Sequence, residues 1–302
     1  MTVAPERLAD VADVDCAGRQ ALVTGSTSGI GRAAALALGR LGADVVVHGR
    51  NTDAGEQLVD ELTGIGVNAT FVPADFASVE AVRTLADTVR TETDGLDILL
   101  NNAGGLFRSG RLTDLGVEYT FHVNHLSPYL LTAELLEHLR EGARIATTAS
   151  SAHRGTSLDL ERVTSVDSYS GMWAYSHSKL VNVLFTAELA RLLDASDRSV
   201  TANSVHPGAI PGSGFSRFLP GPIPKLVKPL SAVPGVATVA DGAAELLGPA
   251  VSPRTADISG RYFAGQEPAT PSRAARDHEA ARRLWTYSAD VLGIDTPLGS
   301  ES

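Results

Sequence analysis

Hydrophobic positions along the chain form short buried runs that alternate with longer stretches in which apolar residues recur every three to four positions. The runs predict strands and the stretches predict helices. The predicted strands are Ala21–Val23, Asp44–His48, Ala69–Pro73, Ile98–Asn101, Arg144–Thr148, Val200–His206 and Ile258–Phe263. The predicted helices are Gly29–Leu41, Asp53–Leu62, Val79–Arg90, Leu115–Leu139 (with a kink or boundary at Pro128), Trp173–Leu193 and a closing helix at about 274–292. This alternation predicts an α/β protein with a doubly wound parallel sheet and helices on both faces.

The domain organisation follows from the same pattern. We expect an N-terminal extension at 1–17 and one domain at 18–302, with no internal repeat. The main irregular stretch, Ala209–Val236, interleaves prolines and glycines with apolar side chains such as Phe215 and Phe218. It is either a long surface connection or an apolar lid over a ligand, since long loops in compact domains are usually functional or disordered.

The composition of the chain restricts the classes of partner that the protein could bind. The 302 residues carry a net charge of −10, which argues against nucleic acid and anionic membrane surfaces. A single cysteine, Cys16, cannot form an internal disulfide. The N-terminus is acidic, without the cationic start and apolar stretch of a signal peptide, and no run reaches the length of a membrane helix. We therefore expect a cytoplasmic protein without a membrane anchor.

The first predicted strand is followed by a glycine-rich loop, Thr24-Gly25-Ser26-Thr27-Ser28-Gly29-Ile30-Gly31, which opens the first helix. Glycines in this place let the backbone turn tightly and approach a pyrophosphate on the positive helix N-terminus. A glycine cluster alone is often only a turn, but its position between a strand and a helix supports a Rossmann-type nucleotide site.

Further motifs occur in a fixed order along the chain. They are Asn101-Asn102-Ala103-Gly104, Asn124, Ser150 at a strand end, Tyr175-Ser176-His177-Ser178-Lys179 and His206-Pro207-Gly208. Together with the loop, they resemble the short-chain dehydrogenase/reductase family, from about Gly18 to Gly293. Ser150-Ser151-Ala152-His153 and Ser259-Gly260-Arg261-Tyr262-Phe263 are similar to its retinol-dehydrogenase-like branch.

The resemblance implies a nicotinamide cofactor. The implied binding residues are Gly25, Ser26, Ser28, Gly29, Ile30, Gly31, Arg50, Asn51, Asp75, Phe76, Asn102, Ala103, Gly104, Tyr175, Lys179, Pro207, Gly208 and Ile210. Gly49 stands where relatives that prefer NAD(H) keep an acid for the ribose 2′-hydroxyl. Arg50 follows it and could grip a 2′-phosphate. Arg50 is either that phosphate ligand or a solvated loop residue, and we expect NADP(H) rather than NAD(H).

The resemblance also implies the reacting groups Asn124, Ser150, Tyr175 and Lys179. Tyr175 and Lys179 are four residues apart, on one helix face. An ammonium about 4 Å from the phenol would lower the tyrosine pKa to about 7, where a proton shuttle works well. Ser150 would hold the substrate oxygen, and Asn124 would anchor a water that relays protons through Lys179. His153 is either a residue of the substrate pocket or a structural histidine.

These features predict an oxidoreductase that moves a hydride between NADP(H) and an alcohol/carbonyl pair, with Tyr175 as proton donor and acceptor. The substrate would be a small-molecule alcohol, ketone or aldehyde, apolar or mixed in character, and the protein could form a homo-oligomer. One alternative is a catalytically silent NADP-binding regulator, although such proteins typically lose the tyrosine or lysine. Another is a nucleotide-sugar epimerase or dehydratase, which usually has a different glycine spacing. No cluster has metal-ligand spacing.

Overall fold

A computed structural model describes residues 3–208, 210 and 237–299. Its centre is an eight-stranded sheet with the order β3-β2-β1-β4-β5-β6-β7-β8. The strands are β1 (Gln20–Val23), β2 (Asp44–Gly49), β3 (Ala69–Pro73), β4 (Leu96–Asn101), β5 (Leu139–Thr148), β6 (Thr201–His206), β7 (Tyr262–Ala264) and β8 (Glu267–Ala269). All neighbouring strands pair in parallel except β7 and β8, which are antiparallel. The predicted doubly wound fold is confirmed, with one antiparallel edge strand added.

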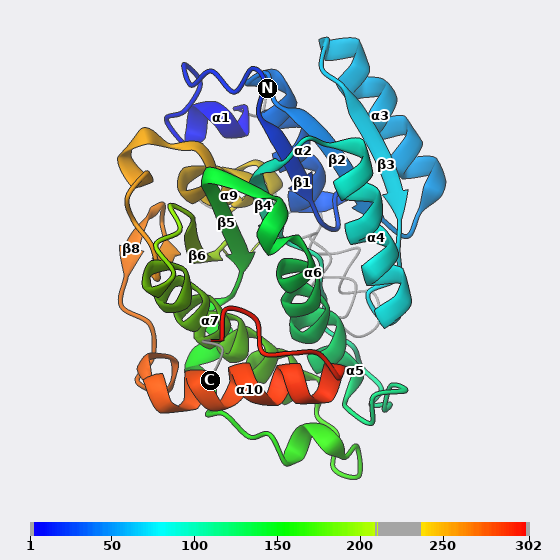
Figure 1. Cartoon of the computed structure of the whole chain (residues 1–302), viewed down its shortest axis with the longest axis vertical. Coiled ribbons are helices and arrows are strands. Elements are labelled where there is room, and N and C mark those ends of the chain that lie inside the picture. The colour runs from blue at the N-terminus through cyan, green and yellow to red at the C-terminus, as the bar shows by residue number, and fades with distance from the viewer. Residues whose placement is uncertain (1–2, 209, 211–236, 300–302) are drawn as a thin grey trace.

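Helices cover both faces of the sheet (Figure 1). One layer holds α2 (Gly29–Arg40), α3 (Thr52–Ile65) and α9 (Val239–Val251), and the other holds α4 (Val79–Glu92), α6 (Ser127–Leu135), α7 (Gly171–Ala195) and α10 (His278–Leu292). Alternate residues of each strand enter different cores: Ala21 and Val23 face the α2 layer, whereas Leu22 faces the α4 layer. Because both faces are buried, the central strands β1 and β4 are mostly apolar.

The long helix predicted over Leu115–Leu139 is divided into several pieces. These are α5 (Tyr119–Phe121), a π-helical turn (His122–Leu126), α6 and a 3₁₀ turn (Leu136–His138). Pro128 lies in the first turn of α6, directly after the π turn, and lacks the N–H that would continue the helical hydrogen bonding there. The boundary expected at Pro128 is therefore present, and the π turn before it contains Asn124.

Two predicted elements near the C-terminus have different bounds. The closing helix begins at His278 because the Asp277 side chain accepts hydrogen bonds from the amides of Glu279 and Ala280, both at 3.0 Å. The strand predicted at Ile258–Phe263 is shorter, since Gly260 turns there with φ of +72° and β7 starts at Tyr262.

The N-terminal residues pack onto the domain. Helix α1 (Pro5–Leu8) lies beside α9 (Figure 1), and Ala9, Val11 and Cys16 join the core between α2, α9 and the sheet. The Arg40 guanidinium donates to both oxygens of Glu6, at 2.7 and 2.8 Å. Residues 3–17 therefore look polar in the sequence but contain four buried apolar residues, since Pro5 is buried as well.

Candidate active site

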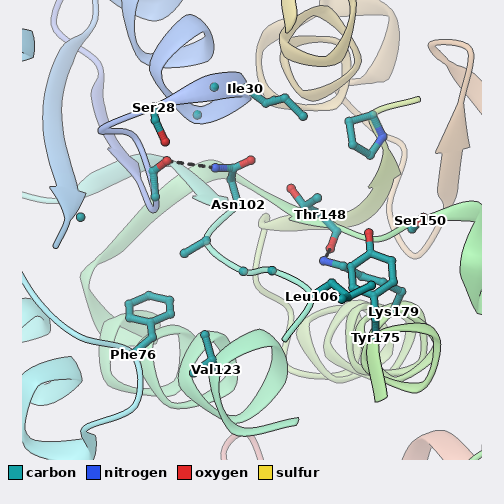
Figure 2. A pocket seen from close by; sticks show the side chains of 18 of the residues that line it. Ser28, Ile30, Phe76, Asn102, Leu106, Val123, Thr148, Ser150, Tyr175 and Lys179 are labelled. Carbon is teal, nitrogen blue, oxygen red and sulfur yellow. Dashed lines mark hydrogen bonds between the residues drawn. The ribbon is translucent and has the colours of Figure 1, made fainter. Parts of the chain in front are cut away.

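A cavity of about 790 Å³ opens at the carboxyl ends of the central strands, where the strand order reverses between β1 and β4. Parallel sheets of this kind bind their ligands at such a switch point. The glycine loop and Phe76 line one end, and Ser150 with Tyr175 lines the other (Figure 2). We call these the adenosine end and the reacting end.

The glycines of the loop stand where a side chain would not fit. A Cβ at Gly31 would lie 2.5 Å from the Gly25 carbonyl oxygen and 2.5 Å from Asn102 Nδ2. A Cβ at Gly25, whose φ is +66°, would lie 2.9 Å from Ala103 Cα. Asn102 Nδ2 also donates to the Thr24 carbonyl at 2.9 Å. The loop after β1 is thus held tightly against the loop after β4, leaving a cradle of backbone that fits a pyrophosphate.

Most of the residues predicted to bind the cofactor line this one cavity. They are Gly25, Ser28, Gly29, Ile30, Gly31, Arg50, Asn51, Asp75, Phe76, Asn102, Ala103, Gly104, Tyr175, Lys179, Pro207, Gly208 and Ile210. Ser26 does not line it, because its buried hydroxyl bonds the backbone of His48. The side chain of Asn51 accepts from the Ala54 amide at 3.1 Å and so caps α3.

The end of β2 shows why residue 49 is a glycine. A Cβ at Gly49 would lie 2.5 Å from Thr27 Cγ2 and 2.7 Å from Thr27 Oγ1. Arg50, which follows, is exposed and lines the cavity. The position where an acid would oppose a 2′-phosphate is therefore filled by the Thr27 side chain, and a guanidinium stands beside it.

At the reacting end, α7 carries both Tyr175 and Lys179 (Figure 2). The buried Lys179 Nζ donates to the Thr148 carbonyl at 2.9 Å and lies 5.7 Å from the centre of the Tyr175 ring. Ser150 follows β5 and forms a side-chain hydrogen bond with Tyr175. Ser150, Tyr175 and Lys179 are thus brought together as the sequence predicts.

The pKa of Tyr175 moves opposite to the expected direction. Burial raises it above 10, and the hydrogen bond with Ser150 only partly offsets this. Burial also lowers the pKa of Lys179 to about 8. The predicted drop toward ~7 is wrong for the protein's own groups, because desolvation of the buried phenol outweighs the stabilisation of its phenolate.

Asn124 lies beside the cavity without lining it. Its Oδ1 accepts from the Gly105 amide at 2.9 Å, and its Nδ2 donates to the Gly105 carbonyl at 2.8 Å and to Ser178 Oγ at 2.9 Å. The side chain therefore ties the loop after β4 to α7. Its amide is engaged by protein groups, so an Asn124-anchored water would have to use the main chain.

His153 is structural. Its Nδ1 lies 2.6 Å from the Ser150 carbonyl, and its Nε2 accepts from the Ser272 amide at 3.0 Å. Both ring nitrogens are used, and His153 is fully buried outside the cavity wall.

Several cavity residues were not predicted from the sequence. Apolar side chains beside the reacting end come from Leu106, Phe107, Ala152 and Met172, whereas Val123 lies toward Phe76 (Figure 2). Their positions could have been a signal, because Leu106 and Phe107 closely follow the Asn102-Ala103-Gly104 turn and Met172 precedes Tyr175 by about one helical turn. His48, Gly49 and Thr27 line the adenosine end.

Across residues 3–208, 210 and 237–299, no three His, Cys, Asp or Glu side chains are grouped so that they could hold a metal ion. No helix there is long and apolar enough to cross a membrane.

The doubly wound fold and the residues of this cavity are those of an oxidoreductase, and comparison with known proteins identifies its family. The family described as short chain dehydrogenase matches residues 19–217. Retinol dehydrogenase 13 from Homo sapiens is 36% identical over 295 residues, covering 93% of this chain and 86% of that protein. The chain belongs to the short-chain dehydrogenase/reductase family, in its retinol-dehydrogenase-like branch, and such proteins bind a nicotinamide cofactor.

Solved structures agree with this assignment. A protein from Mycobacterium Paratuberculosis superposes with a TM-score of 0.75 at 30% identity, covering 94% of this chain and 97% of that one. A short chain dehydrogenase from Burkholderia cenocepacia, solved in complex with NADP, gives a TM-score of 0.65 at 29% identity, covering 86% and 99%.

Proposed function

We propose that the protein is an NADP(H)-dependent oxidoreductase acting on an alcohol/carbonyl pair, with Tyr175 as the proton donor and acceptor. The observation that carries this proposal is the placement of Ser150, Tyr175 and Lys179 in the same cavity as the glycine loop. A bound nicotinamide cofactor supplies or accepts the hydride, and the protein must supply the proton and the positioning.

Tyr175 is suited to give a proton to a carbonyl oxygen. With its pKa raised by burial, the phenol keeps its proton at neutral pH. The Ser150 hydroxyl, already bonded to Tyr175, can donate to the same substrate oxygen. Lys179 is charged below about pH 8 and is fixed by the Thr148 carbonyl. As the proton leaves Tyr175, the Lys179 ammonium stabilises the phenolate that forms.

The preference for NADP(H) rests on the residues at the end of β2. Thr27 occupies the space that a side chain at Gly49 would need, and Arg50 presents a guanidinium at the cavity. A guanidinium binds phosphate through charge-assisted hydrogen bonds. The NADP complex of the Burkholderia cenocepacia structure is consistent with this preference.

The substrate is proposed to be an aldehyde, a ketone or the matching alcohol with an apolar body. Leu106, Phe107 and Met172 supply apolar wall beside Tyr175, and the Ser150 and Tyr175 hydroxyls supply the polar groups that orient the oxygen. The predicted lid, Ala209–Val236, lies outside the described residues apart from Ile210.

The test is hydride transfer by the purified protein. NADPH and NADH oxidation would be followed with a panel of apolar and polar aldehydes and ketones, with Tyr175→Phe in parallel. We expect turnover with NADPH that the variant loses. Tight NADPH binding without turnover on any member of the panel would favour the silent regulator instead.

A further inference from the structure

His48 occupies an unusual place for a polar side chain. It lies within β2, the strand between β1 and β3, and only 2% of it is exposed. Its ring nevertheless reaches the adenosine end of the cavity, where it stacks on Phe76 with ring centres 4.6 Å apart and planes 22° apart. An apolar residue could fill the core here, so the polar atoms of the ring need an explanation.

Both ring nitrogens have partners in the cavity loops. Nδ1 accepts from the Gly25 amide at 3.2 Å, and Nε2 lies 3.2 Å from the Ala74 carbonyl. Because the Gly25 amide can only donate, Nδ1 must be unprotonated and Nε2 must carry the hydrogen that Ala74 accepts. Burial lowers the pKa of His48 to about 4, which keeps this neutral form at physiological pH.

These two bonds join segments that are far apart in the sequence. Gly25 starts the glycine loop after β1, whereas Ala74 and Phe76 belong to the loop after β3. The His48 backbone adds contacts on the glycine-loop side, since its carbonyl accepts from the Ser26 amide at 2.8 Å and its amide donates to Ser26 Oγ at 3.0 Å. One residue thus links the two walls between which a nucleotide would lie.

We propose that His48 is a positioning residue for the adenosine half of the cofactor, holding the Gly25 amide and the Phe76 ring at a fixed separation. This role rests on the proposed function only in that the cavity takes a nicotinamide dinucleotide. His48 does not select between NADP(H) and NAD(H), because that selection is assigned to Arg50. His48 is also remote from the reacting end.

Two amide variants separate the ring contacts. In His48→Asn, the asparagine Oδ1 replaces the histidine Nδ1 at the same number of bonds from Cβ, so it can still accept from the Gly25 amide. In His48→Gln, the glutamine Nε2 replaces the histidine Nε2 at the same number of bonds from Cβ, so it can still donate to the Ala74 carbonyl. Leaving the half-buried Gly25 amide without its ring acceptor should cost at most about 5- to 150-fold in affinity. We therefore expect the Gln variant to bind nucleotide much more weakly than the Asn variant.

The experiment measures Kd by calorimetry for NADPH and for 2′-phospho-AMP, which carries only the adenosine half. Both Kd values should rise in His48→Gln and rise less in His48→Asn, while kcat at saturating NADPH stays near wild type in both. His177→Gln is the matched control: His177 is also buried, accepts from the Asp159 amide at 3.1 Å and stacks on Trp173, but lies outside the cavity wall. It should lower thermal stability without moving the Kd of 2′-phospho-AMP.

The outcomes are distinguishable. Wild-type Kd values in both His48 variants, or the same rise in His177→Gln as in His48→Gln, would overturn the positioning role. An equal rise in the Asn and Gln variants would overturn its assignment to the Gly25 contact. Failure of the wild-type protein itself to bind NADPH and NADH would instead overturn the proposed function.

Discussion

The two ends of the cavity are built on different physical principles. At the adenosine end, a neutral side chain connects two backbone segments by hydrogen bonds, as His48 does between Gly25 and Ala74. At the reacting end, a phenol and an ammonium are buried, and burial opposes the charged form of both. The first arrangement favours a rigid shape, whereas the second sacrifices stability to keep ionisable groups out of water.

The largest effect is expected from Tyr175→Phe, which removes only one hydroxyl. Turnover should fall by about 10²-fold or more, the usual contribution of general acid/base catalysis. The Kd for NADPH should change little, since the adenosine end is intact. Steady-state kinetics and calorimetry on the same protein check both parts. Retention of more than about a tenth of the wild-type rate would place the proton donor elsewhere.

Arg50→Ala tests the guanidinium at the adenosine end. A charge-assisted contact to a 2′-phosphate is worth about 1.5–3 kcal/mol, or roughly 10- to 150-fold in affinity. The variant should lose most of its preference for NADPH by weakening NADPH, with NADH unchanged. The measurement is kcat/KM for both cofactors. An enzyme that prefers NADH, or is indifferent to Arg50, would contradict the assigned role of this residue.

Lys179→Met sharpens the comparison because activity and stability should move in opposite directions. A pKa of about 8 in the folded protein, against 10.5 for an ordinary lysine, means that the buried ammonium destabilises the fold. The cost is complete below pH 8 and disappears by about pH 10.5. At pH 7 the variant should gain about 1–3 kcal/mol of unfolding free energy, as one pKa unit is worth about 1.4 kcal/mol.

The same variant should lose roughly tenfold or more in carbonyl reduction, and its rate should lack the decline above about pH 8 that deprotonation of Lys179 gives the wild type. Urea titrations and pH–rate profiles provide the two readouts. The Thr148 carbonyl keeps a partner in the variant, because Asn182 Nδ2 also donates to it at 3.1 Å. An unchanged pH profile would remove the lysine from the mechanism.

Gly49→Asp should have the smallest effect on cofactor preference unless Thr27 is changed with it. The new Cβ would meet Thr27 Cγ2 at 2.5 Å, so the single variant should bind both NADPH and NADH less well. Thr27→Ala removes the two closest atoms, and the double variant should recover NADH by several-fold but not NADPH. Thr27→Ala alone is the control. Full recovery of NADPH in the double variant would show that the carboxylate does not face the 2′ position.

Much of this site could be predicted because its parts are local in the sequence. The loop Gly25–Gly31 lies between a strand and a helix, and Tyr175 and Lys179 share a helix face, so short-range spacing was enough. The contact between Thr27 and Gly49, and those of His48 with Gly25 and Phe76, join loops at the ends of different strands. No periodicity in the sequence reports such pairings.

The prediction that the pKa of Tyr175 is lowered was wrong for a related reason. Spacing reveals which charge lies near the phenol, but not how far the phenol is removed from water, and here burial was the larger influence. The sequence also did not reveal the burial of Val11 and Cys16 in the N-terminal segment, because the core that they join includes residues of α9, more than two hundred positions later.

The antiparallel strand β8 bears on how copies of this protein can meet. It is only three residues long, its Pro268 has no amide hydrogen, and its Glu267 is exposed. An open sheet edge is a template for pairing with another chain, and short length, proline and charge are the features that blunt it. This margin of the sheet is therefore protected against growth into aggregates, and association of copies across the β8 edge has to use side-chain packing instead of shared strands.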